Sequence, residues 1–174
     1  FVYSRVARRA SRHAHGPVPA ALDRNAMRDT SEDAQDRRCQ LGLAAEQGDA
    51  EAQCLLGVML FNGDGGPEDF AEARRLLGLA AEQGHANAQC TLGMTHRIGA
   101  GGQVDFAEAR RLYGLAAEQG DAEAQCMLGH MHRMGEGGPE DSAAARRLLG
   151  LAAEQGHAEA QCMLGHMHRM GEGG

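Results

Sequence analysis

The stretch "AAEQGDAEAQCMLGHMHRMGEGG" occupies residues 116–138 and returns at 152–174 with a single change, from Asp121 to His157. Its first five letters, "AAEQG", also begin at positions 44 and 80, so the chain has a constant period of 36 residues. A fixed period of this length is typical of proteins built from stacked structural repeats. We therefore expect one small structural unit that is copied along the chain.

Each period predicts two short helices separated by glycine turns. In the unit that begins at Asp121, apolar residues at helical spacing form one stripe over about 13 residues. The glycine cluster at 135–138 ends this helix, and Pro139 is suited to the first turn of a second helix that stops at Gly156. Neither helix can bury its apolar face alone, so the period predicts an all-α solenoid of antiparallel helix pairs.

The repeated residues are similar to those of the Sel-one-like repeat (SLR) family, whose members are related to the tetratricopeptide repeats. That family has an Ala before a Leu-Gly pair, an aromatic residue three positions later, a G-x-G turn and a second helix ending in "AA-x-x-G". The matching residues here are Ala124, Leu128, Gly129, His132, 135–137, Ala145 and 152–156. The resemblance covers about residues 31–174 and implies a right-handed solenoid.

Two sets of residues depart from the family pattern. One set replaces the usual Tyr, and we expect its members to act as packing residues near the core; the other set stands where Val is common. Because both changes remove side-chain volume, we expect low stability for each repeat. The two sets are His96, His132 and His168, and Gly66, Gly102 and Gly138.

The charge divides the chain into two segments. Residues 1–30 carry six Arg and two Asp, a net charge of +4, and contain no repeat; we expect a disordered segment or an organelle transit peptide. Residues 31–174 carry eleven Arg and twenty-two acidic residues, a net charge of −11. The array is expected to comprise an eroded half-repeat (31–48), three repeats (49–84, 85–120 and 121–156) and a truncated repeat (157–174). The missing initiator Met and the bare last helix also suggest a fragment of a longer protein.

The composition excludes several classes of function. An acidic body repels nucleic acid, and no apolar run approaches the ~20 residues that a membrane span needs. The glycine turns lack the Lys of a phosphate-binding loop, and no catalytic set of nucleophile and base is visible, so we expect no enzyme and no cofactor. Disulfides between the single Cys residues of successive repeats are disfavoured, because equivalent positions on stacked helices lie roughly 10 Å apart and a disulfide needs Cα atoms within ~7 Å; this favours reduced thiols and, weakly, an intracellular location.

The function predicted from the repeats is that of a scaffold or adaptor, which holds a partner peptide or helix in the concave groove of the solenoid. By analogy with tetratricopeptide repeats, we expect the groove to lie on the first helices, roughly 180–280° around each helix from its core Ala. Its Met and Cys side chains suit apolar groups, and its Arg residues suit acidic ones. The predicted groove residues are Cys54, Val58, Phe61, Cys90, Met94, Arg97, Cys126, His130, Arg133, Cys162, His166 and Arg169.

Two alternatives remain open at the level of the sequence. Cys126 and His130, like Cys162 and His166, lie four residues apart on one helix face and could bind a metal or respond to redox state. However, zinc ligands must approach within ~2.3 Å of one ion, which stacked helices do not favour. The second alternative is a regulatory repeat region of a larger enzyme or membrane complex.

Overall fold

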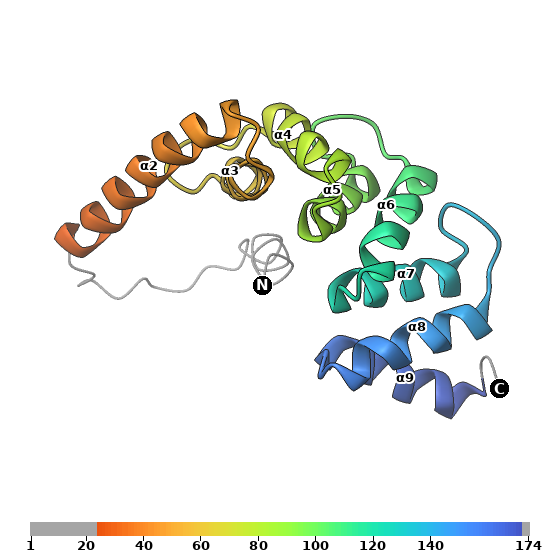
Figure 1. Ribbon diagram of the computed structural model, residues 1–174. Coiled ribbons are helices and arrows are strands. Elements are labelled where there is room, and N and C mark those ends of the chain that lie inside the picture. Colours follow the sequence, from red (N-terminus) through yellow and green to blue (C-terminus); the bar gives the residue numbers. More distant parts are fainter. Residues whose placement is uncertain (1–23, 172–174) are drawn as a thin grey trace.

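The computed structural model describes residues 24–171, and every regular element in this part of the chain is an α-helix (Figure 1). The first helix, α2 (Arg24–Glu46), has 23 residues, and each of the others has 13. The others are α3 (Ala50–Asn62), α4 (Phe70–Glu82), α5 (Ala86–Ile98), α6 (Phe106–Glu118), α7 (Ala122–Met134), α8 (Ser142–Glu154) and α9 (Ala158–Met170).

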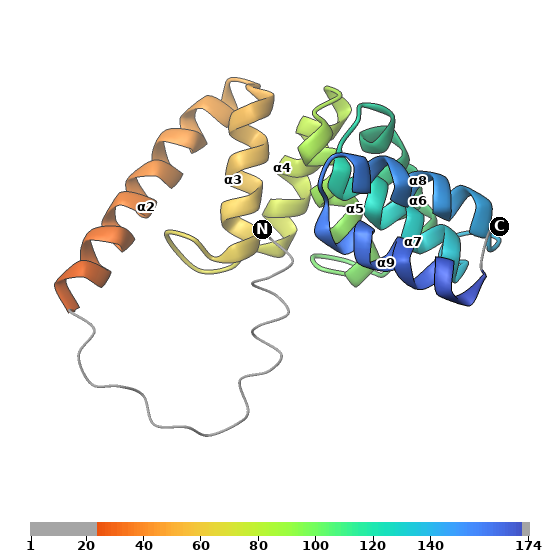
Figure 2. The same cartoon turned by 90° about the horizontal axis from the view of Figure 1, so that it is seen from below.

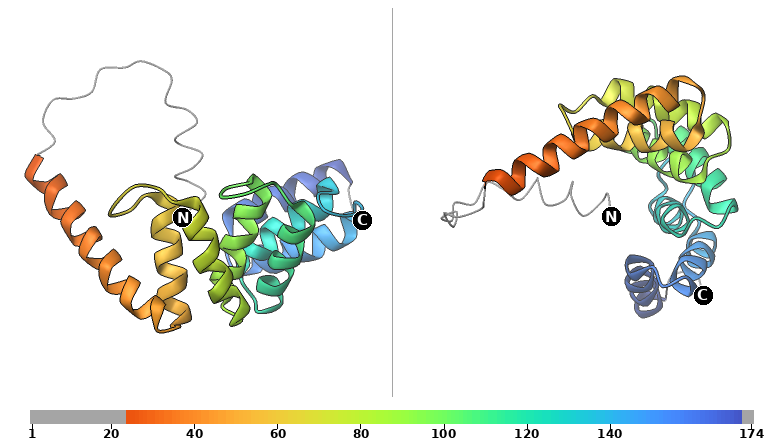
Figure 3. Two further views of the ribbon diagram at one scale, coloured as in Figure 1. Left: turned by 90° about the horizontal axis from the view of Figure 1, so that it is seen from above. Right: turned by 60° about the vertical axis from the view of Figure 1, so that its left-hand side comes forward.

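The helices form a curved stack of hairpins. The pairs α3–α4, α5–α6 and α7–α8 are the hairpins, and α2 and α9 flank them. In the right-hand view of Figure 3, α7 and α9 lie on the inner side of the curve, and α6 and α8 lie on the outer side. Figure 2 shows that α2 diverges from α3 towards its own N-terminal end. The architecture is the all-α repeat solenoid that the period predicts.

Side-chain caps fix where the helices begin. Asp49 and Asp121 accept hydrogen bonds from the backbone N–H three residues later, as Asp does at many helix starts. His85 caps α5 through its Nδ1 atom in the same way. The second helices begin later than expected, because Asp141 is the N-cap of α8 and Pro139 lies in the turn before it.

Glycine in the first helices allows each hairpin to pack closely. A Cβ atom at Gly57 would lie 2.8 Å from Cγ of Leu77, and one at Gly129 would lie 2.9 Å from Cγ of Leu149. These distances are shorter than carbon atoms tolerate, so the Gly of the Leu-Gly pair is a requirement of packing in the hairpins α3–α4 and α7–α8.

The prediction of lost packing volume at Gly66, Gly102 and Gly138 is wrong. A Cβ atom at each of these glycines would collide with a guanidinium group from the preceding repeat. The space is therefore occupied by Arg rather than empty. The three arginines are Arg38, Arg74 and Arg110.

A ladder of buried glutamines ties successive repeats together. Gln89 is 4% exposed and donates from its amide nitrogen to the carbonyl of Ala81 at the end of the preceding helix. Its amide oxygen accepts from Gln119, which follows α6. The same two bonds recur one repeat earlier at Gln53 and one repeat later at Gln125. Both ends of each buried amide are thus satisfied, as burial of a polar group requires.

Candidate partner-binding surface

The cysteines predicted to line the groove are buried between repeats. Cys54 and Cys126 have no exposed surface, and Cys90 is 7% exposed. Cys54 packs with Ala88 and Leu92 of the next first helix, α5. The prediction that these three cysteines face a partner is wrong, because each first helix contacts the following repeat as well as its own mate. Cys162, on α9, is exposed.

Two further predicted residues are engaged inside the stack. Phe61 is 5% exposed and lies edge-on to Phe70, with ring centroids 5.4 Å apart. Nε of Arg97 lies 2.9 Å from Oε2 of Glu136, in the glycine turn of the next repeat, and only 16% of the Arg97 side chain is exposed. Arg97 therefore serves a junction between repeats.

The remaining predicted residues reach the surface to different degrees. Those on α3, α5 and α7 are half-buried, and those on α9 are exposed. The half-buried residues are Val58, Met94, His130 and Arg133, and the exposed residues are His166 and Arg169.

One stripe of the first helices remains open to solvent, and we call it the inner stripe. It consists of the half-buried Val58, Met94 and His130 and the exposed His166. An apolar residue follows each of the last three by four positions and also belongs to the stripe. At about 100° per residue, these two positions lie only about 40° apart around the helix. The apolar residues are Ile98, Met134 and Met170, with exposed fractions of 46%, 54% and 63%.

The thiols of the stack are poorly suited to metal or redox chemistry. Burial raises the pKa of Cys54 to about 11 and that of Cys126 to about 12, so both are protonated at neutral pH, whereas the thiolate is the reactive form. Burial, together with nearby Arg97, lowers the pKa of His130. Within the described residues, no group of three or more His, Cys, Asp or Glu side chains could hold a metal ion.

Polar contacts between repeats are the feature that sequence reasoning missed. In each of the last three junctions, an Arg of a second helix contacts the His that replaces the family Tyr. His132, predicted as a packing residue, is half-buried and lies 2.7 Å from Nη2 of Arg110 through its Nδ1 atom. In the sequence, each Arg precedes its His by 22 residues, and this constant spacing is the signal that could have revealed the contacts. The pairs are Arg74 with His96, Arg110 with His132 and Arg146 with His168.

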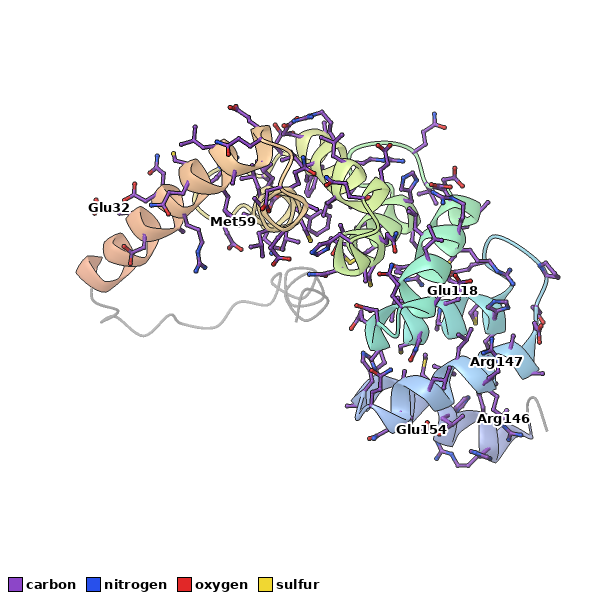
Figure 4. All side chains as sticks on the ribbon, in the orientation of Figure 1. Glu32, Met59, Glu118, Arg146, Arg147 and Glu154 are labelled. Atoms are coloured by element: carbon purple, nitrogen blue, oxygen red, sulfur yellow. The ribbon has the colours of Figure 1, made fainter. Side chains whose placement is uncertain are left out.

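The outer surface carries a regular set of carboxylates. Glu118 and Glu154, at the ends of α6 and α8, are exposed (Figure 4), as are Glu46 and Glu82. Among the helices of residues 24–171, none is both long and apolar enough to cross a membrane.

Comparison with known proteins identifies the repeat. The Sel1 repeat model matches residues 50–85, 86–121, 122–157 and 158–174. A search of curated proteins finds no significant match. Solved structures do match. A Sel1 repeat protein from Oxalobacter formigenes is 34% identical, with a TM-score of 0.76 over 80% of this chain and 56% of that one.

Two other solved structures extend this comparison. The protein c5321 of uropathogenic Escherichia coli, a protective antigen with an SLR fold, is 37% identical, with a TM-score of 0.75 over 78% of this chain. The present chain spans only 29% of its length. The Helicobacter pylori cysteine-rich protein B is 20% identical, with a TM-score of 0.61 over 77% of this chain and 96% of that one, and this likeness concerns the fold alone.

Proposed function

The chain belongs to the Sel1 repeat family, and from this premise we propose that it is a scaffold that holds a partner protein on its inner stripe. Sel1-repeat proteins are generally non-enzymatic protein-interaction scaffolds. The observation that supports the inner stripe is the exposed apolar side chain that it presents on each of three successive first helices, α5, α7 and α9. Exposed apolar groups in a contiguous row are typical of sites where another protein binds.

The partner that fits this stripe is a peptide or helix with apolar residues. Met134 and Met170 offer flexible, polarizable side chains that adapt to different apolar shapes. We expect acidic residues of the partner to bind the exposed Arg169 rather than Arg97, because Arg97 already pairs with Glu136. We retain no metal or redox function, and we propose no catalytic role for the chain.

The experiment compares two double variants at exposed apolar positions. Ile98→Glu with Met134→Glu places charges on the inner stripe, and Leu79→Glu with Leu115→Glu places them on the outer helices, at positions that are 37% and 36% exposed. Substitutions at exposed positions usually change stability by less than about 0.5 kcal/mol, so both variants should fold.

Proteins captured by the wild type are then quantified for each variant. We expect at least one partner to bind the inner variant about tenfold more weakly, or about 1.4 kcal/mol, and to bind the outer variant normally. If every captured protein binds both variants equally, the inner stripe is not the binding surface.

A further inference from the structure

The Arg–His contacts lie at three successive junctions between repeats. At the first, Nη2 of Arg74 lies 2.7 Å from Nδ1 and 3.1 Å from Nε2 of His96, so one guanidinium nitrogen spans both ring nitrogens. At the second, Arg110 contacts His132 at 2.7 Å and 3.4 Å. At the third, Arg146 extends from α8 towards α9 and approaches Nδ1 of His168 to 3.0 Å (Figure 4).

At the first two junctions, the guanidinium group packs against the glycine turn of the following repeat. A Cβ atom at Gly102 would collide with Nη1 of Arg74, and one at Gly138 would collide with Nη1 of Arg110. The Arg110 group also donates a hydrogen bond of 3.4 Å to the carbonyl of Pro139. Because the guanidinium packs against the turn, the Arg side chain cannot move away from the imidazole without giving up these contacts.

The contacts require a neutral imidazole. A guanidinium group only donates hydrogen bonds and stays charged at all relevant pH values, so the ring must offer it a lone pair or an uncharged edge. A protonated ring would place two positive charges in contact. We propose that the contacts of His96 and His132 make their two junctions between repeats acid-labile, so that the stack loosens there when these imidazoles become protonated.

Burial and the charged groups around His96 determine whether its pKa is raised or lowered. Arg74 of α4 and Arg111 of α6 disfavour the imidazolium, whereas Glu108 of α6 and its N-cap Asp105 favour it. Burial is the largest influence, and the balance lowers the pKa of His96.

The surroundings of His132 have the same balance. Burial is again the largest influence, Arg110 and Arg147 oppose protonation, Asp141 favours it, and the pKa of His132 is lowered. A histidine with a lowered pKa in the folded state contributes stability that is fully present above its ordinary pKa of about 6.5 and is lost as the pH falls through the folded-state value. Acidification therefore loosens these junctions while most carboxylates remain ionised.

The chain also contains a junction without this sensitivity. Between α2 and α3, the residue equivalent to His96 is Leu60, which is 5% exposed, and Arg38 donates instead to the carbonyl of Pro67. A junction can thus pack with Arg and without a titrating ring. The proposal is therefore specific to the junctions that carry His.

The buried cysteines provide a reporter for individual junctions. Cys54 is covered by residues of α5, and Cys90 packs in the cluster that includes Met127 of α7. Each thiol becomes accessible when its own junction opens. Cys39 is exposed and serves as the reference for the intrinsic rate of the labelling reaction.

The experiment measures labelling of the full chain by 4,4′-dithiodipyridine at about pH 7.5 and about pH 5.5, on either side of the ordinary histidine pKa. Mass spectrometry gives the labelling rates of Cys54 and Cys90 relative to Cys39. In the wild type, both relative rates should rise severalfold on acidification. In His132→Gln, whose amide oxygen accepts a hydrogen bond without titrating, Cys90 should stay protected and Cys54 should still open.

Two further variants keep the test decisive. His166→Gln removes an exposed histidine of α9, and the labelling rates of Cys54 and Cys90 should respond to pH in this variant as they do in the wild type. His132→Leu copies the natural junction at Leu60, and it replaces the Gln variant if that one does not fold. The proposal is overturned if Cys90 opens on acidification as much in the folded His132 variant as in the wild type, or if neither thiol opens in the wild type.

Discussion

Two glycines of the hairpin α7–α8 should respond in opposite ways to replacement by Ala. Gly in a helix interior is less favourable than Ala by about 0.5–1 kcal/mol. At Gly150 an added Cβ would meet no atom within 4 Å, so Gly150→Ala should gain this full amount. At Gly129 the added Cβ would lie 2.9 Å from Cγ of the fully buried Leu149 and 3.2 Å from the carbonyl oxygen of Ala145.

The crowding at Gly129 outweighs the gain in helix propensity. Overpacking a well-packed site typically costs about 1–3 kcal/mol. After the same propensity gain, Gly129→Ala should be destabilised by about 0–2 kcal/mol, and the two variants should differ by about 1–3 kcal/mol.

Urea unfolding, followed by far-UV circular dichroism, measures this difference. Both glycines belong to one hairpin, so the comparison is not affected by the way in which stability is distributed along a repeat array. Equal m-values for the two variants would show that the midpoints can be compared directly. The packing argument would be refuted if Gly129→Ala were as stable as Gly150→Ala.

Three other predictions concern the links between repeats. Replacing the buried Gln125 by Leu should lower the free energy of unfolding by about 1–3 kcal/mol, because the carbonyl of Ala117 and the amide of Gln155 lose their hydrogen-bond partner; urea unfolding measures this. Glu136→Arg should destabilise the junction at Arg97, and adding Arg97→Glu should recover part of the loss in a double-mutant cycle; purely additive losses would contradict the bridge. At about pH 8, iodoacetamide should modify the exposed Cys162 and spare Cys126, whose pKa burial raises to about 12; equal rates in a mass-spectrometric time course would contradict the described packing.

The fold was predictable because the signals for it are local and repeated. Apolar spacing, Asp caps and glycine turns each act within one helix or turn, and four copies of the pattern remove ambiguity about its period. The later start of α8 at Ser142 depends on the choice between Pro139 and Asp141 as the helix boundary. Both residues are suited to a helix start, and only the backbone of the turn decides between them.

The groove was only partly predictable because a helix in a solenoid contacts more than its mate. The sequence pattern of α7 gives the stripe that packs on α8, with Ala124 and Met131 at its centre. The contact between Cys126 and the next repeat follows from the angle between successive hairpins, which no residue within one repeat encodes. His130 and Cys126 both lie within the predicted arc, yet only His130 reaches solvent in part.

The one difference between the two longest copies also has a structural meaning that depends on the neighbouring repeat. His157 caps α9, and its Nε2 atom lies 3.1 Å from Glu123, 34 residues earlier. By the same register, Asp121 lies opposite residue 87, which is Asn rather than Glu and so avoids a pair of like charges. Exposed pairs of this kind contribute less than about 1 kcal/mol each, yet they distinguish the correct neighbour from a wrong one. Near-identical repeats are therefore not interchangeable, because each cap suits the repeat that precedes it.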